Sequence, residues 1–131
     1  MKRTQLYLET SVWNFYFADD APEKKEITLR FFEKVKQDIY EIFISDVVIE
    51  EIKRAKEKKR QSLLKLITEY NPIRLIMTED AFKLAKTYIS EGILPASKMN
   101  DAMHVGIASV FEVDALISWN LKHIANLEKW N

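Results

Sequence analysis

The sequence contains no cysteine, and this absence excludes whole classes of structure. A chain without thiols forms neither disulfides nor thiolate zinc sites, so its stability must come from a packed core. With 131 residues, 47% of them hydrophobic, the chain can bury such a core without a structural metal. We therefore expect residues 1–131 to form a single domain.

An excess of one charge and long apolar runs are also missing. Lys and Arg total 20, as do Asp and Glu, so the net charge points to neither nucleic acid nor a membrane surface as a partner. No apolar run approaches the roughly 18 residues of a transmembrane helix, and there is no signal-peptide pattern. These absences predict a soluble, cytoplasmic protein with no membrane partner.

What the sequence does have is an alternation of short apolar segments with segments of helical periodicity. The short segments predict strands at residues 5–8, 39–45, 73–77 and 113–118. The helical patterns cover residues 23–37, from Val48 to the Asn71-Pro72 break, from Thr78 to Gly92, and 102–111. Nearly all-apolar strands between helices indicate an α/β protein with a parallel sheet covered on both faces.

Acidic and amide side chains stand where these strands end. Glu9 follows the first strand, Glu51 lies a turn or two beyond the second, and Asn120 follows the last. Asp101 begins the apolar helix that leads into the last strand. In open parallel sheets the functional crevice lies at the carboxyl ends of the strands, so we expect these groups to converge there. Converging carboxylates repel each other, and Mg²⁺ or Mn²⁺ is the natural compensation.

Four short motifs support this interpretation. They are "YLETSV" at residues 7–12, "ISDVVIEEI" at 44–52, "NDAMHVGIA" at 100–108 and "ALISWNLKHI" at 115–124. In this order they resemble the motifs of PIN-domain ribonucleases, best those of VapC-like toxins and similar prokaryotic PIN proteins. The resemblance implies a three-layer α/β/α sandwich with a central parallel sheet, and RNA cleavage that depends on Mg²⁺ or Mn²⁺.

The resemblance also assigns the site residues. It implies that Glu9, Glu51 and Asp101 are the catalytic metal ligands, that Asn120 holds the fourth metal position, and that Ser11 and Ser118 support them. Glu51 is preferred to Glu50 because its spacing from Ser45 matches the second motif and because it shares a helical face with Val48 and Ile52. The implied nucleophile is a water molecule activated by the ion.

Each of these acids also has a simpler interpretation. Glu9 or Asp101 alone could merely cap a helix, and Glu51 could form a solvated pair with Arg54 or Lys56. His104, on a nearly apolar helix, is more typical of a neutral, hydrogen-bonded core histidine than of a group that orients a ligand or contacts substrate. We prefer the ligand interpretation for the acids because the motifs occur together.

Substrate contacts are the least specific prediction. Lys53 and Arg54 open the basic run 53–60 directly after Glu51 and could hold an RNA backbone, although such a run is usually a solvated helix face. His123 follows the last motif and could bind phosphate or cap a helix. Trp13 and Trp119 could stack on unpaired bases, but tryptophans at such positions more often fill cores.

Together these features predict a metal-dependent ribonuclease, the toxin component of a toxin–antitoxin pair, with RNA as substrate. By resemblance, a homodimer and an antitoxin partner are expected. The alternative is a PIN-fold binding or assembly protein without nuclease activity, because Glu9 stands where the family usually has aspartate. Its additional methylene displaces the carboxylate, and a displacement of about 1 Å can cost ~10²-fold in rate.

Overall fold

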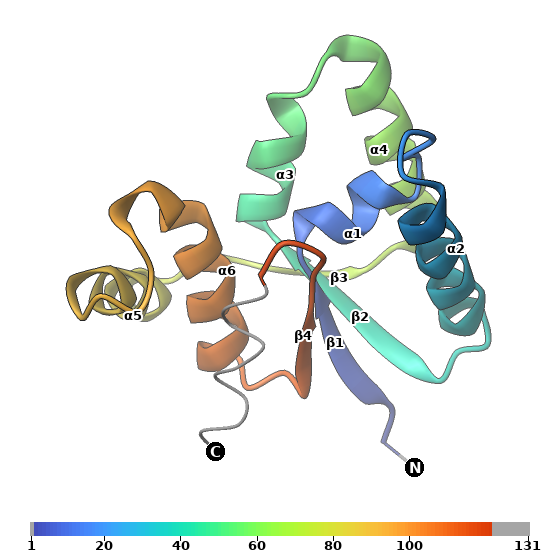
Figure 1. Ribbon diagram of the computed structural model, residues 1–131. Helices are drawn as coiled ribbons and strands as arrows, with labels where there is room; N and C mark the ends of the chain where they lie inside the picture. Colours follow the sequence, from blue (N-terminus) through green and yellow to red (C-terminus); the bar gives the residue numbers. More distant parts are fainter. Residues whose placement is uncertain (1, 122–131) are drawn as a thin grey trace.

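The computed structural model describes residues 2–121 and contains a four-stranded sheet (Figure 1). All neighbouring strands are parallel, in the order β3-β2-β1-β4. The bounds are Thr4–Leu8 for β1, Tyr40–Ser45 for β2, Ile73–Leu75 for β3 and Ala115–Ile117 for β4. The predicted parallel sheet is confirmed, although β3 and β4 are shorter than the segments 73–77 and 113–118 that their composition indicated.

Helices occupy the connections between the strands. They are α1 (Thr10–Phe15), α2 (Pro22–Lys36), α3 (Asp46–Lys53), α4 (Glu57–Tyr70), α5 (Glu79–Ser90) and α6 (Met99–Val110), with a short 3-10 helix at Ala96–Lys98. In Figure 1, α2 lies on one side of the sheet and α5 and α6 lie on the other. Helices therefore cover both faces of a central parallel sheet, as predicted.

Two helix boundaries differ from the sequence prediction. The helical pattern from Val48 to Tyr70 is interrupted after Lys53, so it forms two helices, α3 and α4, at an angle to each other (Figure 1). Helix α6 starts at Met99 instead of residue 102, which puts Asp101 inside its first turn and leaves no side-chain cap at its start. The apolar period alone could not place these boundaries, because the residues there are polar and fit either state.

The two central strands form the core. Leu6, Tyr7 and Leu8 of β1 are all buried, so apolar side chains face helices on both sides of the sheet. In β2, residues 42–45 are buried in the same way. Tyr7 of β1 pairs with Phe43 of β2 on one side and with Leu116 of β4 on the other, and this pairing defines the register of these three strands.

Parallel pairing brings the ends of distant segments to one edge of the sheet. Glu9 follows β1, Ser45 ends β2, and Ser118 follows β4. The backbone N–H of Glu9 donates to the carbonyl oxygen of Ile117 at 3.1 Å, which extends the β1–β4 pairing to the residue that carries the carboxylate. The carboxyl-end edge is therefore where the predicted groups meet.

Helix α6, which delivers two side chains to that edge, is held close to α5 by one glycine. A Cβ atom placed on Gly106 would lie 2.5 Å from the carbonyl oxygen of Ala81, a distance that real side chains do not adopt. Only glycine permits this approach of the two helices. A larger residue here would push α6 away and move the side chains of its first two turns.

Part of the prediction concerns residues outside the range 2–121. The predicted substrate-binding residue His123 lies there. Within the described range, no helix combines the length and the apolar character needed to cross a membrane.

Candidate metal site

Glu9 lies at the junction between β1 and α1. Its backbone is extended, and its Oε1 accepts a hydrogen bond from the backbone N–H of Ser11 at 3.0 Å, which makes it the N-cap of α1. The capping interpretation of Glu9 is therefore correct as a local description. It does not exclude metal binding, because a cap uses one carboxylate oxygen and leaves the other.

Two hydroxyl groups hold the same oxygen of Glu9. Ser11 Oγ donates to Oε1 at 2.5 Å and Ser118 Oγ donates to it at 2.7 Å. As a residue, Glu9 is only 3% exposed. Within the described range, no hydrogen bond reaches Oε2. Ser11 and Ser118, predicted as supporting residues, thus fix Glu9 through one oxygen.

Glu51 lies opposite, in the second turn of α3. Its Oε1 accepts hydrogen bonds from Thr10 Oγ1 and His104 Nε2, both at 2.6 Å, and Asn100 Nδ2 lies 3.5 Å from its Oε2. Glu50 is exposed and pairs with Lys53 at 3.7 Å instead. Among the described residues, no ion pair joins Glu51 to Arg54 or Lys56, so the solvated-pair alternative is wrong for Glu51.

These contacts keep Glu51 ionised. Burial of the half-buried side chain by itself raises the pKa of the carboxyl, but the hydrogen bonds from His104, Thr10 and Asn100 lower the pKa below its ordinary value. Glu51 is therefore a carboxylate that can only accept hydrogen bonds and donate electron pairs.

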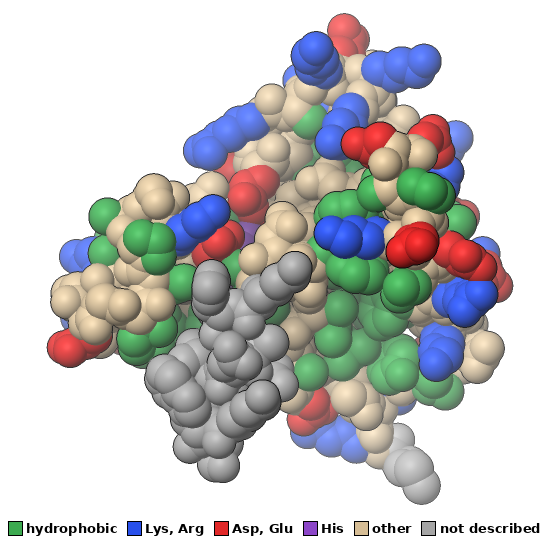
Figure 2. All heavy atoms as spheres, in the orientation of Figure 1, with side chains coloured by type: hydrophobic (Ala, Val, Ile, Leu, Met, Phe, Trp, Pro, Cys, Tyr) green, Lys and Arg blue, Asp and Glu red, His purple; other side chains and the backbone are tan. Residues whose placement is uncertain are grey.

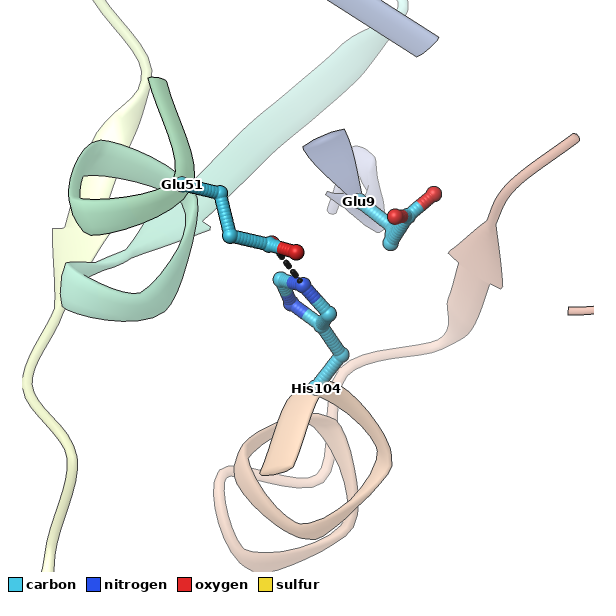
Figure 3. Close-up of side chains that lie close together, drawn as sticks. All are labelled: Glu9, Glu51 and His104. Atoms are coloured by element: carbon cyan, nitrogen blue, oxygen red, sulfur yellow. Dashed lines mark hydrogen bonds and ion pairs between the residues drawn. The ribbon is translucent and has the colours of Figure 1, made fainter. Parts of the chain in front are cut away.

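His104 is fully buried one turn after Asp101 in α6. Its Nδ1 lies 2.7 Å from the hydroxyl oxygen of Tyr7, and that hydroxyl lies 2.7 Å from Ser45 Oγ. Burial raises the pKa of Tyr7, so its phenol stays protonated. The prediction of a buried, hydrogen-bonded histidine is confirmed, and the same side chain also contacts Glu51 (Figure 3).

Three of these groups are close enough to share one ion. One ligand atom each from Glu9, Glu51 and His104 all lie within 4.8 Å of one another. Asp101 does not belong to this group, but its pKa is affected by burial and by the charges of Glu9 and Glu51. Burial raises the pKa of Asp101 above its ordinary value, and the negative charges of Glu9 and Glu51 raise it further.

The donor set suits a hard divalent cation. Glu9, Glu51 and Asp101 offer carboxylate oxygens, which Mg²⁺ and Mn²⁺ prefer. Burial is the largest cause of the raised pKa of Asp101, and a positive ion would relieve the repulsion from Glu9 and Glu51 that adds to it. The residues present therefore fit the metal that the sequence motifs imply.

The remaining predicted groups lie around this centre. Asn120 is exposed just after β4, and its backbone N–H donates to Ser118 Oγ at 3.0 Å. Lys53 and Arg54 are exposed at the end of α3, and Figure 2 shows Lys and Arg side chains gathered at the α3–α4 end of this face. Trp13 is fully buried against Phe32, so it belongs to the core and does not stack on bases.

Sequence reasoning missed several donors in the site. Thr10, Tyr7 and Asn100 each contribute a hydrogen bond there, although none of them was predicted as a site residue. Thr10 and Asn100 are adjacent to Glu9 and Asp101, so inspection of each motif's immediate neighbours could have found them. Tyr7 carried no signal, because an aromatic residue in a buried strand is ordinary.

Known structures share this architecture, although neither a protein-family model nor a curated protein sequence matches the chain. The chain is similar to VapC20 of Mycobacterium tuberculosis, a toxin that cleaves the sarcin–ricin loop, with 13% identity and a TM-score of 0.71 over 92% of this chain and 94% of that protein. It is also similar to VapBC2 of Rickettsia felis bound to a promoter DNA fragment, with 15% identity and a TM-score of 0.66 over 94% of this chain and 92% of that one. The predicted PIN-like fold is therefore confirmed.

Proposed function

We propose that this protein is a Mg²⁺- or Mn²⁺-dependent endoribonuclease and the toxin of a toxin–antitoxin pair. The observation that carries the proposal is the gathering of Glu9 and Glu51 from separate segments, with one ligand atom of each within 4.8 Å of the other, beside Asp101, whose pKa is raised by burial and further by the charges of the two glutamates. A group of carboxylates that repel each other at a sheet edge is costly unless a cation neutralises it.

The two glutamates are prepared in the same way. In both cases Oε1 is held by short hydrogen bonds from protein donors. Within the described range Oε2 of Glu9 accepts no hydrogen bond and Oε2 of Glu51 has only the 3.5 Å contact with Asn100 Nδ2, so these two oxygens can face an ion. Asp101 completes the proposed ligand set, with Asn120 as a neutral fourth position. A bound divalent ion supplies Lewis acidity that activates water and stabilises charge on the phosphodiester.

The chain's own residues then bind and orient the RNA. Lys53 and Arg54 are exposed beside Glu51 and offer positive charge to a phosphate backbone. In this proposal the carboxylates hold the ion, Ser11 and Ser118 hold Glu9, and single-stranded RNA is positioned along the α3–α4 end. His123 remains a predicted contact.

Partners follow from the same proposal. The similarity to VapC20, a toxin that cleaves the sarcin–ricin loop, supports RNA as the substrate class. The Rickettsia felis structure contains VapBC2 on promoter DNA, and this supports an antitoxin partner for the present chain. We further propose a homodimer and a cytoplasmic location.

Metal titration tests the proposal. Addition of Mn²⁺ to the chelated protein is expected to raise the melting temperature and to switch on cleavage of single-stranded RNA, because an ion that binds only the folded state stabilises it by mass action. Glu51→Gln keeps the shape but removes the charge, so both effects are expected to be lost. The readouts are differential scanning fluorimetry and gel analysis of a labelled RNA.

The matched control is Glu50→Gln, the neighbouring exposed glutamate that pairs with Lys53. It is expected to behave as wild type in both assays. If Mn²⁺ neither stabilises the wild-type protein nor supports cleavage, the enzyme proposal is wrong, and a binding or assembly role with a decayed site takes its place.

A further inference from the structure

We propose that His104 is a positioning residue for Glu51, held in place by a buried hydrogen-bond chain that starts at Ser45 and passes through Tyr7. The chain consists of consecutive contacts of 2.7 Å, 2.7 Å and 2.6 Å from Ser45 Oγ to the Tyr7 hydroxyl, from there to His104 Nδ1, and from His104 Nε2 to Glu51 Oε1. The inference rests on the proposed function, because it takes Glu51 as a metal ligand.

The burial of the chain makes it rigid. Tyr7, Ser45 and His104 are each essentially fully buried, and they come from β1, β2 and α6. Among the described residues, no buried side-chain polar atom lacks a partner. A buried polar network with every member satisfied fixes its side chains in one arrangement. The imidazole therefore cannot turn without leaving a buried group unpaired.

The direction of the hydrogen bonds follows from what each atom can do. Ionised Glu51 can only accept, so His104 Nε2 must carry a proton and donate it. Ser45 Oγ already accepts from the backbone N–H of Val47 at 3.2 Å, which leaves its own proton for the Tyr7 oxygen. Tyr7 then donates to Nδ1 of the neutral ring, and this donation keeps the proton on Nε2.

This direction separates positioning from metal ligation. His104 is close enough to Glu9 and Glu51 to be taken for a third ligand, but a nitrogen that carries a proton has no free electron pair for a metal. By holding Oε1, His104 and Thr10 leave Oε2 of Glu51, which has only the 3.5 Å contact with Asn100 Nδ2, to face the ion. Figure 3 shows the His104–Glu51 contact, with Glu9 on the neighbouring segment.

The protonation of the ring can be observed directly. In the metal-free wild-type protein, two-dimensional ¹⁵N–¹H correlation of the histidine rings is expected to show His104 with a proton on Nε2, with His104→Gln used to assign the signals. A neutral ring with the proton on Nδ1 and a bare Nε2 would overturn the proposal. This measurement uses no metal and no RNA, so it decides the inference even when the proposed function fails.

Metal affinity supplies the second readout. His104→Leu removes the donor to Glu51, and Mn²⁺ affinity measured by calorimetry is expected to fall by about 10–100-fold, the usual effect of removing a partner of a ligand. His104→Gln places an amide N–H near the position of Nε2 and is expected to bind Mn²⁺ roughly tenfold more tightly than the leucine variant, within a few fold of wild type.

A direct ligand role predicts a different pattern. If Nε2 bound the ion, glutamine would fail to rescue, and Zn²⁺ affinity would fall far more than Mn²⁺ affinity, because imidazole favours Zn²⁺. Either result overturns the positioning role. Circular dichroism of each variant checks folding, and a leucine variant that fails to fold leaves the glutamine variant and the wild-type spectrum to decide.

Discussion

Glu9 and Glu51 face the same site but are held in different ways. Glu9 is 3% exposed and is held by the backbone N–H and hydroxyl of Ser11, two residues away, and by Ser118. The Glu51 side chain is 24% exposed and takes its support from Thr10, Asn100 and His104, all more than forty residues away in sequence. One carboxylate is fixed mainly by its own turn, and the other by the tertiary fold.

This difference indicates which of the two glutamates keeps its position more easily when the packing of the helices is perturbed. A local cap forms whenever β1 runs into α1, so the position of Glu9 depends on few contacts. Glu51 reaches its position only when α6 packs against α3 and the sheet, which depends on the close α5–α6 approach at Gly106. Perturbations of α6 should therefore disturb Glu51 before Glu9.

Shortening each glutamate by one methylene should have the largest effect. In Glu9→Asp and Glu51→Asp the carboxylate withdraws from its donors, and displacement of about 1 Å costs ~10²-fold in rate, so we expect losses of this order in kcat/KM for single-stranded RNA. Glu9→Asp keeps the cap of α1, because aspartate is a favoured N-cap, but it loses the contact with Ser118.

The opposite result would be informative for Glu9. An increase in cleavage would mean that the Glu9 carboxylate extends too far into the site in the natural protein, because its side chain is one methylene longer than that of the usual aspartate. The control is Glu50→Asp, which shortens the exposed neighbour of Glu51 and is expected to leave kcat/KM unchanged.

Removal of one hydroxyl beside each glutamate should have an intermediate effect. Ser11→Ala deletes a buried hydrogen bond to the Glu9 carboxylate and the acceptor of the Trp119 backbone N–H. Hydrogen bonds to charged groups contribute about 1.5–3 kcal/mol, so we expect a loss of that size in the free energy of unfolding of the metal-free protein. Urea titration measures it.

Thr10→Val is the matched change at Glu51. It keeps the shape of the side chain and removes the donor, but Glu51 is partly exposed, so water can replace the lost contact. We expect a loss below about 1.5 kcal/mol. Equal losses in Ser11→Ala and Thr10→Val would contradict the difference in anchoring between the two glutamates.

Asp101→Asn should give the smallest effect on stability, and the size of this effect depends on pH. The pKa of Asp101 is higher in the folded protein than in the unfolded chain, so the folded state binds the proton of this carboxyl more tightly. The contribution of Asp101 to the free energy of unfolding therefore falls as the pH rises through the folded-state pKa. Asparagine mimics the protonated form. In chelator, the melting temperature of the variant should therefore exceed that of wild type at about pH 7 and approach it toward about pH 4.

The control for that experiment is Asp20→Asn, an exposed acid in the turn before α2. It should show no such pH-dependent difference. A lower melting temperature for Asp101→Asn at every pH would contradict the repulsion between Asp101 and the two glutamates. The same variant should bind Mn²⁺ more weakly, because it gives up one proposed ligand.

Much of the fold could be predicted from residue patterns. The apolar run ending at Leu8 and the β-branched run ending at Ser45 required buried strands, and periodic apolar residues required α2 and α5. The division between α3 and α4 could not be predicted, because Arg54 and Lys56 fit a helix as well as a turn. Local preference there is too weak to decide, and packing decides instead.

By itself the sequence determined the parallel sheet and the placement of Glu9, Glu51 and Asp101 beside its carboxyl-end edge, because strand period and motif spacing are local properties of the chain. Only the tertiary structure decided that His104 joins Glu51 and that Tyr7 and Ser45 hold its ring. These contacts link residues 38 to 97 positions apart, so their geometry depends on strand register and helix packing. No pattern within one segment contains that information.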